Sequence, residues 1–224
     1  MIDFRCREGV FFDFLDIIKI QIREEIPGEG EVVMEKRVST RSIVITGMFA
    51  AVIAVLAQVA LPMPSGVPVT LQTFAIALTG VVLGAKLGMA AAGVYILLGA
   101  VGVPVFSGFA GGLGILFGKS GGFIWGFLFL ALLCGLGCQI KNKVVGWGLG
   151  IVGLAVCHLL GIFQFMVLMK MGFAESALLV SVPFLIKDVV SVAFAFVLGL
   201  QIRKQLFRAD ILQGAPKKET LEKL

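Results

Sequence analysis

The chain has 224 residues, of which 58% are hydrophobic and 29 are glycine, while 15% are charged and the mean hydropathy is +1.03. Soluble domains are about 45–50% apolar with glycine included, so a soluble monomer of this composition would expose large apolar patches to water. A disordered chain is excluded because this sequence has far too much apolar surface to leave in water. The composition therefore predicts an integral membrane protein.

The net charge of +5 does not indicate a nucleic-acid-binding protein, because the basic residues are scattered singly between apolar blocks. No motif for a nucleophile, a pair of catalytic carboxylates or a metal cluster is present, so we expect no catalytic residue, no metal and no cofactor. The single His also excludes a His-rich metal site. The cysteines are interpreted as small residues of membrane helices rather than disulfide partners or metal ligands, because none forms a CxxC pair: Cys6, Cys134, Cys138 and Cys157.

Residues 1–33 differ from the rest because they are charged and contain only a short amphipathic stretch, around residues 10–22. Two interpretations remain open for this N-terminal extension. It is a helix that lies on the membrane surface, or it precedes a true start of translation at Met34. We assign it no function.

Apolar blocks follow from Ile43 onward, and a membrane-spanning helix needs about 20 apolar residues. The second and third blocks meet at Gly84, which predicts a tight turn there. The predicted fold is all-α, with six transmembrane helices in a membrane domain of residues 34–202 and a basic cytoplasmic tail of residues 203–224. The six blocks cover residues 43–62, 69–85, 87–104, 121–140, 146–169 and 177–202.

The segment between the third and fourth blocks, residues 107–122, contains seven glycines and is predicted to be a loop folded back into the protein. It is not a phosphate-binding loop, because Leu113 stands where that motif needs glycine. Nine basic residues lie on one side of the six blocks and two on the other, so both termini are expected in the cytoplasm and the glycine-rich loop outside.

Two adjacent charged residues, Lys187 and Asp188, lie in the middle of the sixth block. Charges at membrane depth are costly and mark functional sites. Neighbours on a regular helix point about 100° apart, so we do not expect the two side chains to pair well. A polar ligand is therefore expected to contact Asp188, whereas Lys187 could equally extend toward the membrane surface.

Uncharged polar residues occur at two further places. Thr70, Gln72 and Thr73 lie at the outer end of the second block. His158 and Gln164 lie in the fifth block and are interpreted as contacts between helices more readily than as ligand contacts.

Four short motifs occur in a recognisable order: residues 68–73 (PVTLQT), 97–106 (LLGAVGVPVF), 111–114 (GGLG) with 121–122 (GG), and 183–184 (PF) ahead of Asp188. In these motifs the chain resembles the BioY family, the biotin-binding subunits of energy-coupling-factor transporters, over about residues 36–202.

The resemblance implies a six-helix membrane subunit that captures biotin near the outer face of the cytoplasmic membrane. It implies a separate transmembrane coupling subunit and two cytoplasmic ATPase subunits as partners, with lipid around the helices and a homo-oligomer left open. Ala50 and Ala54 form a small-residue pair in the first block and match the family's contact with the coupling subunit.

The resemblance also implies the ligand contacts. Asp188 is assigned to the ureido ring of biotin, because a buried carboxylate accepts from its two N–H groups. The sequence departs from the family at the later lysine, where it has Ser191, and at a frequent tyrosine, where it has Phe123. The further predicted contacts are the polar residues Gln72, Thr70 and Gln164, the lid residues Gly111 and Gly112, the ring of Phe123, and Lys187, Lys119 or the loop amides at the biotin carboxylate.

Three alternatives remain open. The chain could capture a different vitamin, or it could be a membrane scaffold without a small ligand, in which a neighbouring subunit satisfies Asp188. An intramembrane enzyme is the least favoured class, because no reactive group of residues is present.

Overall fold

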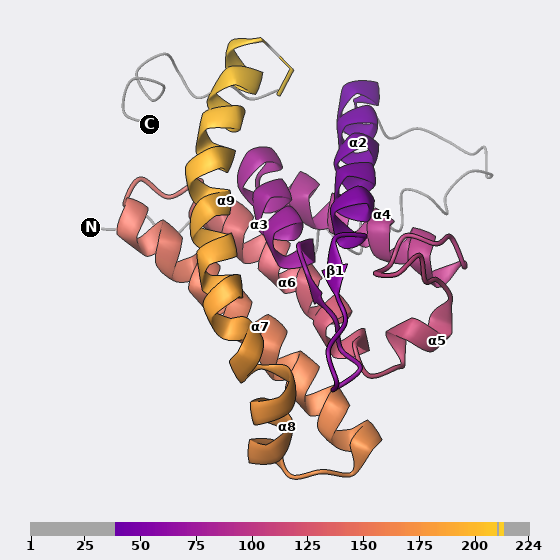
Figure 1. The fold of residues 1–224 in the computed structure, drawn as a ribbon. Helices are drawn as coiled ribbons and strands as arrows, with labels where there is room; N and C mark the ends of the chain where they lie inside the picture. The colour runs from indigo at the N-terminus through magenta and orange to yellow at the C-terminus, as the bar shows by residue number, and fades with distance from the viewer. Residues whose placement is uncertain (1–38, 210, 213–224) are drawn as a thin grey trace, which may run out of the picture. The chain divides into compact units, whose positions relative to one another are not determined.

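The computed structural model describes residues 39–209, 211 and 212. Residues 1–33, for which the sequence left two interpretations open, lie outside the described residues, as does most of the predicted tail. The described chain is mostly helical (Figure 1), and its elements in order are α2 (Thr40–Ala57), β1 (Ala60–Leu61), β2 (Val69–Thr70), α3 (Gln72–Leu83), α4 (Ala85–Ala100), α5 (Leu113–Leu116), α6 (Gly121–Gly137), α7 (Lys143–Met169), α8 (Phe173–Val180) and α9 (Val182–Arg208).

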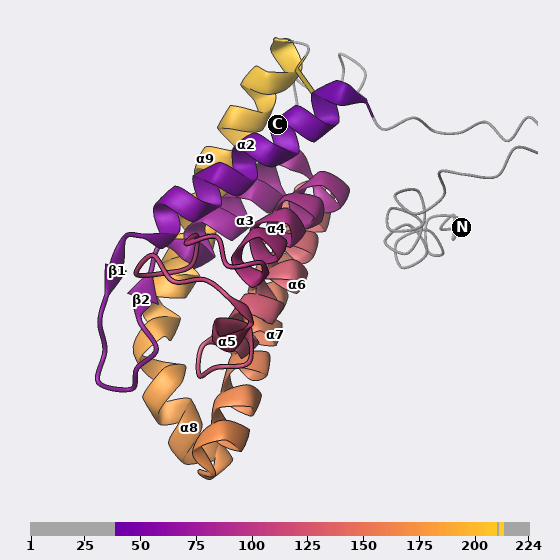
Figure 2. The same cartoon turned by 90° about the vertical axis from the view of Figure 1, so that its right-hand side faces the viewer.

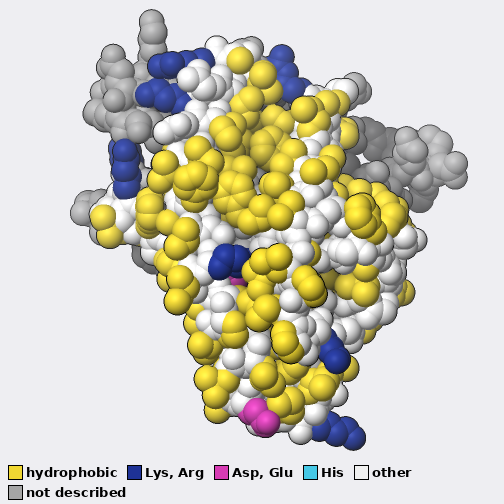
Figure 3. Space-filling model, in the orientation of Figure 1, with side chains coloured by type: hydrophobic (Ala, Val, Ile, Leu, Met, Phe, Trp, Pro, Cys, Tyr) yellow, Lys and Arg dark blue, Asp and Glu magenta, His cyan; other side chains and the backbone are white. Residues whose placement is uncertain are grey.

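Three of these helices, α2, α7 and α9, are long and apolar enough to cross a membrane, judged by length and composition. The apolar helices α3, α4 and α6 are shorter, with 12, 16 and 17 residues. Hydrophobic side chains cover most of the face formed by α2, α3 and α9 (Figure 3), as expected for a surface in contact with lipid.

The described residues include one element that the sequence analysis did not predict, a short antiparallel ladder. Ala60 pairs with Thr70 and Leu61 with Val69. The prolines at positions 62 and 64 cannot continue a helix, and the chain reverses through Gly66, whose φ is +78°. The two segments that flank this turn are then held side by side as β1 and β2 (Figure 2).

Close approach of glycines sets the packing of α6 along α7. A Cβ atom at Gly126 would lie 2.6 Å from the Cα atom of Cys157, and one at Gly146 would lie 2.5 Å from the carbonyl oxygen of Gly137. The predicted tight turn is present, because Gly84, with φ of +85°, is the one residue between α3 and α4. Cys134, Cys138 and Cys157 are unpaired, and Cys6 is outside the described residues.

The sixth apolar block is not one helix. It covers the end of α8 and most of α9, which meet at Ser181 (Figure 1). Pro183 lies in the first turn of α9, where a missing N–H leaves no helical hydrogen bond unmade. Lys187 and Asp188 therefore lie in the second turn of α9 and not in the middle of a span, and α9 continues past the predicted boundary at residue 202 to Arg208.

Candidate functional site

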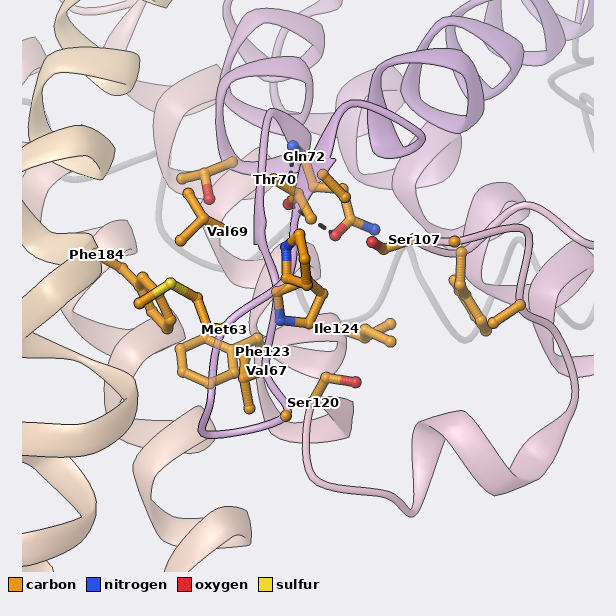
Figure 4. Close-up of a pocket in the computed structure, with 18 of the residues that line it drawn as sticks. Met63, Val67, Val69, Thr70, Gln72, Ser107, Ser120, Phe123, Ile124 and Phe184 are labelled. Atoms are coloured by element: carbon orange, nitrogen blue, oxygen red, sulfur yellow. Dashed lines mark hydrogen bonds between the residues drawn. The ribbon is translucent and has the colours of Figure 1, made fainter.

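A cavity of about 470 Å³ lies beside the β1–β2 ladder and between the first turns of α3, α6 and α9 (Figure 4). This volume is within the range of about 300–1,000 Å³ that small-molecule sites occupy. Its walls are mainly apolar, with Val69, Ile124 and Phe184 among them. Its polar lining comes from the second and sixth apolar blocks and from the glycine-rich segment, namely Thr70, Gln72, Thr73, Ser107, Ser120, Lys187 and Asp188.

The Asp188 carboxylate is the most buried charge at this cavity, with 5% of the residue exposed. Its Oδ1 atom lies 2.5 Å from the Nζ atom of Lys187, and its Oδ2 atom lies 3.3 Å from the Nε2 atom of His158. Lys187 also donates to the carbonyl oxygen of Thr70 at 2.7 Å. The expectation that Lys187 and Asp188 would not pair is therefore wrong, because the long lysine side chain bends back across the angle between the two positions.

The Oδ1 atom of Asp188 is buried and has no hydrogen-bond partner of ordinary geometry among the described residues, although it lies close to the lysine charge. A buried carboxylate oxygen normally accepts at least one hydrogen bond, and leaving one unmade is costly. Since Asp188 lines the cavity, a donor on a bound molecule could fill this position.

A second polar group lines the cavity at the start of α3. The Thr70 hydroxyl donates to the Oε1 atom of Gln72 at 2.9 Å, and the Nε2 atom of Gln72 donates to the Tyr95 hydroxyl at 2.5 Å. Tyr95 is fully buried in α4 and packs edge-on against Phe106. The sequence analysis missed Tyr95, although it is the single tyrosine of the chain and a buried phenol usually needs a partner.

Three predicted ligand contacts are not among the cavity-lining residues. Gln164 donates to the carbonyl oxygens of Leu116 and Gly118 at 2.9 and 2.8 Å, and so ties α7 to the glycine-rich segment. Gly111 and Gly112 pack against the end of α4, where the Gly112 N–H donates to a backbone carbonyl. Direct ligand contact at these three residues stays a prediction.

Phe123 and Lys119 differ in their relation to the cavity. Phe123 lines it and packs edge-on against His158, with ring centroids 5.7 Å apart. Lys119 is not a lining residue, and its Nζ atom lies 3.6 Å from the position of a Cβ atom on Gly66, within the turn that borders the cavity.

Gln58 is a second residue that the sequence analysis missed. Its Nε2 atom donates to the carbonyl oxygens of Val105 and Phe106 at 3.2 Å, and its Oε1 atom accepts from the Phe109 N–H at 2.9 Å. Phe109 has a φ of 56°, a backbone conformation that non-glycine residues rarely adopt. Gln58 therefore connects the end of α2 to the segment that carries Phe106 and Ser107 at the cavity wall.

The predicted partner-binding pair on α2 faces inward. Ala50 is 1% exposed and belongs to the core, and Ala54 is half-buried against it. The exposed small residues of this helix are Gly47 and Ala51. Partner contact at Ala50 and Ala54 stays a prediction.

The comparisons with known proteins agree with one another. The model of the BioY family matches residues 34–208. The "Biotin transporter BioY" of Thermotoga maritima is 36% identical over 173 residues, which cover 73% of this chain and 96% of the relative. The "Probable biotin transporter BioY" of Pyrococcus horikoshii is 35% identical over 164 residues, with coverage of 73% and 96%.

A solved structure shares the fold. It is the 2.1 Å crystal structure of the S-component for biotin from an ECF-type ABC transporter, with a TM-score of 0.67 and 23% identity, and the match covers 79% of this chain and 96% of that chain. The resemblance stated from the motifs is confirmed. With the family model matching residues 34–208 and relatives above 30% identity that are covered over nearly their whole length, the chain belongs to the BioY family.

Proposed function

We propose that this chain captures biotin and carries it across the cytoplasmic membrane as the substrate-specific subunit of an energy-coupling-factor transporter. The names of its relatives and the shared fold support the transport class. The observation that carries the proposal to a site is the buried Asp188 carboxylate at the cavity, whose Oδ1 atom lies beside Lys187 without a hydrogen bond of ordinary geometry among the described residues.

The chemistry of biotin fits this cavity. In the proposal, the ureido N–H groups donate to Asp188, and Gln72 and Thr70 supply further polar contacts. The thioether ring and the valeryl chain are apolar and suit walls that include Phe123 and Ile124. The biotin carboxylate would be bound by Lys187, Lys119 or backbone amides of the glycine-rich segment.

We propose that the glycine-rich segment acts as a lid over the ligand. Gln164 would fix the far end of the segment through Leu116 and Gly118, while Gly111 and Gly112 would fix its near end against α4. The far end of the lid would thus be held by a side-chain amide and its near end by a backbone hydrogen bond, and the region between them borders the cavity at Ile115.

We propose six membrane-inserted helices, α2, α3, α4, α6, α7 and α9, with both termini in the cytoplasm. The junction at Gly84, the residue Gln139 after α6 and Arg203 of α9 lie against one another. Basic residues gather at the end where α9 terminates (Figure 3), as the positive-inside rule requires of a cytoplasmic end. In the proposed domain arrangement, an extension of residues 1–33 and a basic tail flank this membrane domain.

We propose that α2 meets the transmembrane coupling subunit of an assembly that also contains two cytoplasmic ATPases. Gly47 and Ala51 lie on the exposed face of α2, and a Cβ atom on Gly47 would meet nothing within 4 Å. Small exposed residues let two helices approach closely in a membrane. This face is therefore a stronger candidate than Ala50, which is already packed within the chain.

Titration calorimetry of the detergent-purified chain with biotin, beside thiamin and riboflavin, tests the proposed function. Tight binding of biotin alone, near one molecule per chain, is the expected result. Binding of another vitamin in place of biotin would mean that the chain captures that vitamin instead. No heat with any of the three, from folded protein free of co-purified ligand, would favour the scaffold alternative.

A further inference from the structure

The Asp188 carboxylate is contacted by His158, a residue that does not line the cavity. His158 of α7 is 5% exposed and is not among the lining residues. Its Nε2 atom faces the Oδ2 atom of Asp188 at 3.3 Å, and its Nδ1 atom lies 2.8 Å from the Ser181 hydroxyl. Both ring nitrogens are therefore engaged, by two residues 7 positions apart at the start of α9.

We propose that His158 is a positioning residue for ligand capture, whose Nε2–H holds the Asp188 carboxylate toward the cavity while Ser181 fixes the plane of its ring. An ionised carboxylate only accepts hydrogen bonds, so the contact with Oδ2 requires the imidazole proton on Nε2. The inference rests on the proposed function, because the group that His158 orients is the proposed ligand contact.

The two carboxylate oxygens of Asp188 have different contacts and therefore different roles in the proposal. Oδ2 faces His158, whereas Oδ1 faces Lys187 and lacks a hydrogen bond of ordinary geometry among the described residues. Thr73 also interacts with this carboxylate. With Oδ2 held by the ring, rotation of the carboxylate is restricted, and Oδ1 stays beside Lys187 at the cavity, where a ligand donor can reach it.

Ser181 gives the ring a second, independent constraint. It is the residue between α8 and α9, with φ and ψ of −123° and −56°, and its side chain makes no helix-capping hydrogen bond. Its hydroxyl is therefore available to the Nδ1 atom of His158. Phe123 packs edge-on against the same ring, so the imidazole is restrained by both polar and aromatic contacts.

The spectroscopic signals of the imidazole can be assigned without ambiguity, because His158 is the single histidine of the chain. Protein labelled with ¹⁵N-histidine, and purified through a tag without histidine, gives imidazole signals that belong to His158 alone. In the ligand-free chain, a proton on Nε2 is the expected result, and Asp188→Asn should change the Nε2 signal. An Nε2 atom without a proton would overturn the inference.

Biotin affinity gives the second readout. His158→Phe removes both hydrogen bonds and should weaken biotin binding about tenfold or more, since a hydrogen bond to a charged group is lost. His158→Gln retains an amide donor and should recover most of that affinity, and Ser181→Ala should weaken binding less than His158→Phe while changing the imidazole spectrum. Thr79→Val is the matched control, because the buried Thr79 hydroxyl donates within α3 to the carbonyl oxygen of Ala75 and Thr79 is not a cavity-lining residue.

The outcomes separate the inference from the proposed function. Wild-type protein that binds biotin, together with a folded His158→Phe variant of equal affinity, would overturn the positioning role and leave the function intact. If His158→Phe does not fold, His158→Gln and Ser181→Ala decide the question. If the wild-type chain binds no biotin, the proposed function fails and the role in ligand capture fails with it, while the ligand-free imidazole spectrum still decides whether the Nε2–H of His158 holds the Asp188 carboxylate.

Discussion

Lys187 and Asp188 are sequence neighbours on α9, yet the lysine Nζ atom lies 2.5 Å from the aspartate Oδ1 atom and also donates to the backbone of Thr70. The lysine side chain remains 29% exposed, while that of Asp188 is 6% exposed. The negative charge of Asp188 is thus buried, while the positive charge of Lys187 that balances it lies at the partly exposed edge of the cavity. Burying such a carboxylate without a nearby cation would be costly in an apolar protein.

Asp188→Asn tests the proposed ligand contact. Removal of one charge-assisted hydrogen bond costs about 1.5–3 kcal/mol, so biotin affinity should fall about tenfold or more while the protein stays folded. Calorimetry gives the affinity, and a thermal melt checks the fold. Glu175→Gln makes the same chemical change at an exposed position of α8 and should leave the affinity unchanged. Equal affinity of Asp188→Asn and wild type would refute the assignment.

Gln58→Leu tests the connection between α2 and the segment around Phe109. Loss of the acceptor for the Phe109 N–H should speed hydrogen exchange at that amide, and the dissociation of biotin should become faster because the cavity wall is less restrained. Hydrogen-exchange mass spectrometry over residues 103–112 measures the first effect. Gln201→Leu, at an exposed position of α9, is the control. Unchanged exchange in both variants would show that Gln58 does not hold this segment.

Gly126→Ala tests the close packing of α6 on α7. The added Cβ atom would meet the backbone of Cys157 at 2.6 Å, and such overpacking costs about 1–3 kcal/mol. The melting temperature in detergent should therefore fall. Gly148→Ala is a matched helical glycine with nothing within 4 Å, and it should be neutral or slightly stabilising. A Gly126→Ala variant as stable as Gly148→Ala would mean that the two helices separate easily.

Ala51→Phe tests the proposed partner face of α2. A bulky side chain there should reduce biotin uptake by cells that also express the coupling subunit and both ATPases, because the helices can no longer approach closely. The isolated variant should bind biotin with wild-type affinity, since Ala51 is exposed and is not a cavity-lining residue. Ala174→Phe, at an exposed position of α8, is the control for added bulk. Normal uptake with Ala51→Phe would place the partner elsewhere.

Much of the helical architecture followed from hydropathy, while the boundaries within the apolar blocks did not. The prolines at positions 62 and 64 cannot continue a helix, but the ladder of β1 and β2 forms only because the two segments meet in space. Pro183 indicated an uneven helix start in the sixth block, but hydropathy did not show the division into two helices at Ser181, since α8 and α9 are both apolar. Hydropathy shows which residues avoid water, but it does not show whether they lie in a helix, a strand or a turn.

The inward and outward faces of a membrane helix are hard to distinguish by sequence because lipid and protein core are both apolar. Ala50 and Ala51 illustrate this, since neither is polar, yet Ala50 is in the core and Ala51 is exposed. The spacing of small residues alone favoured the pair Ala50 and Ala54, of which the structure turns Ala50 inward.

The sequence by itself determined that this is a membrane protein of the BioY family, because composition and the order of short motifs are properties of the chain. It also singled out Asp188 as a candidate ligand contact, since a charged residue within an apolar block is costly and rare. Only the tertiary structure decided what surrounds that charge. His158 is 30 positions away in sequence, and Tyr95 reaches Gln72 across 23 positions. Such contacts depend on how α3, α4, α7 and α9 pack, and no local pattern specifies that packing.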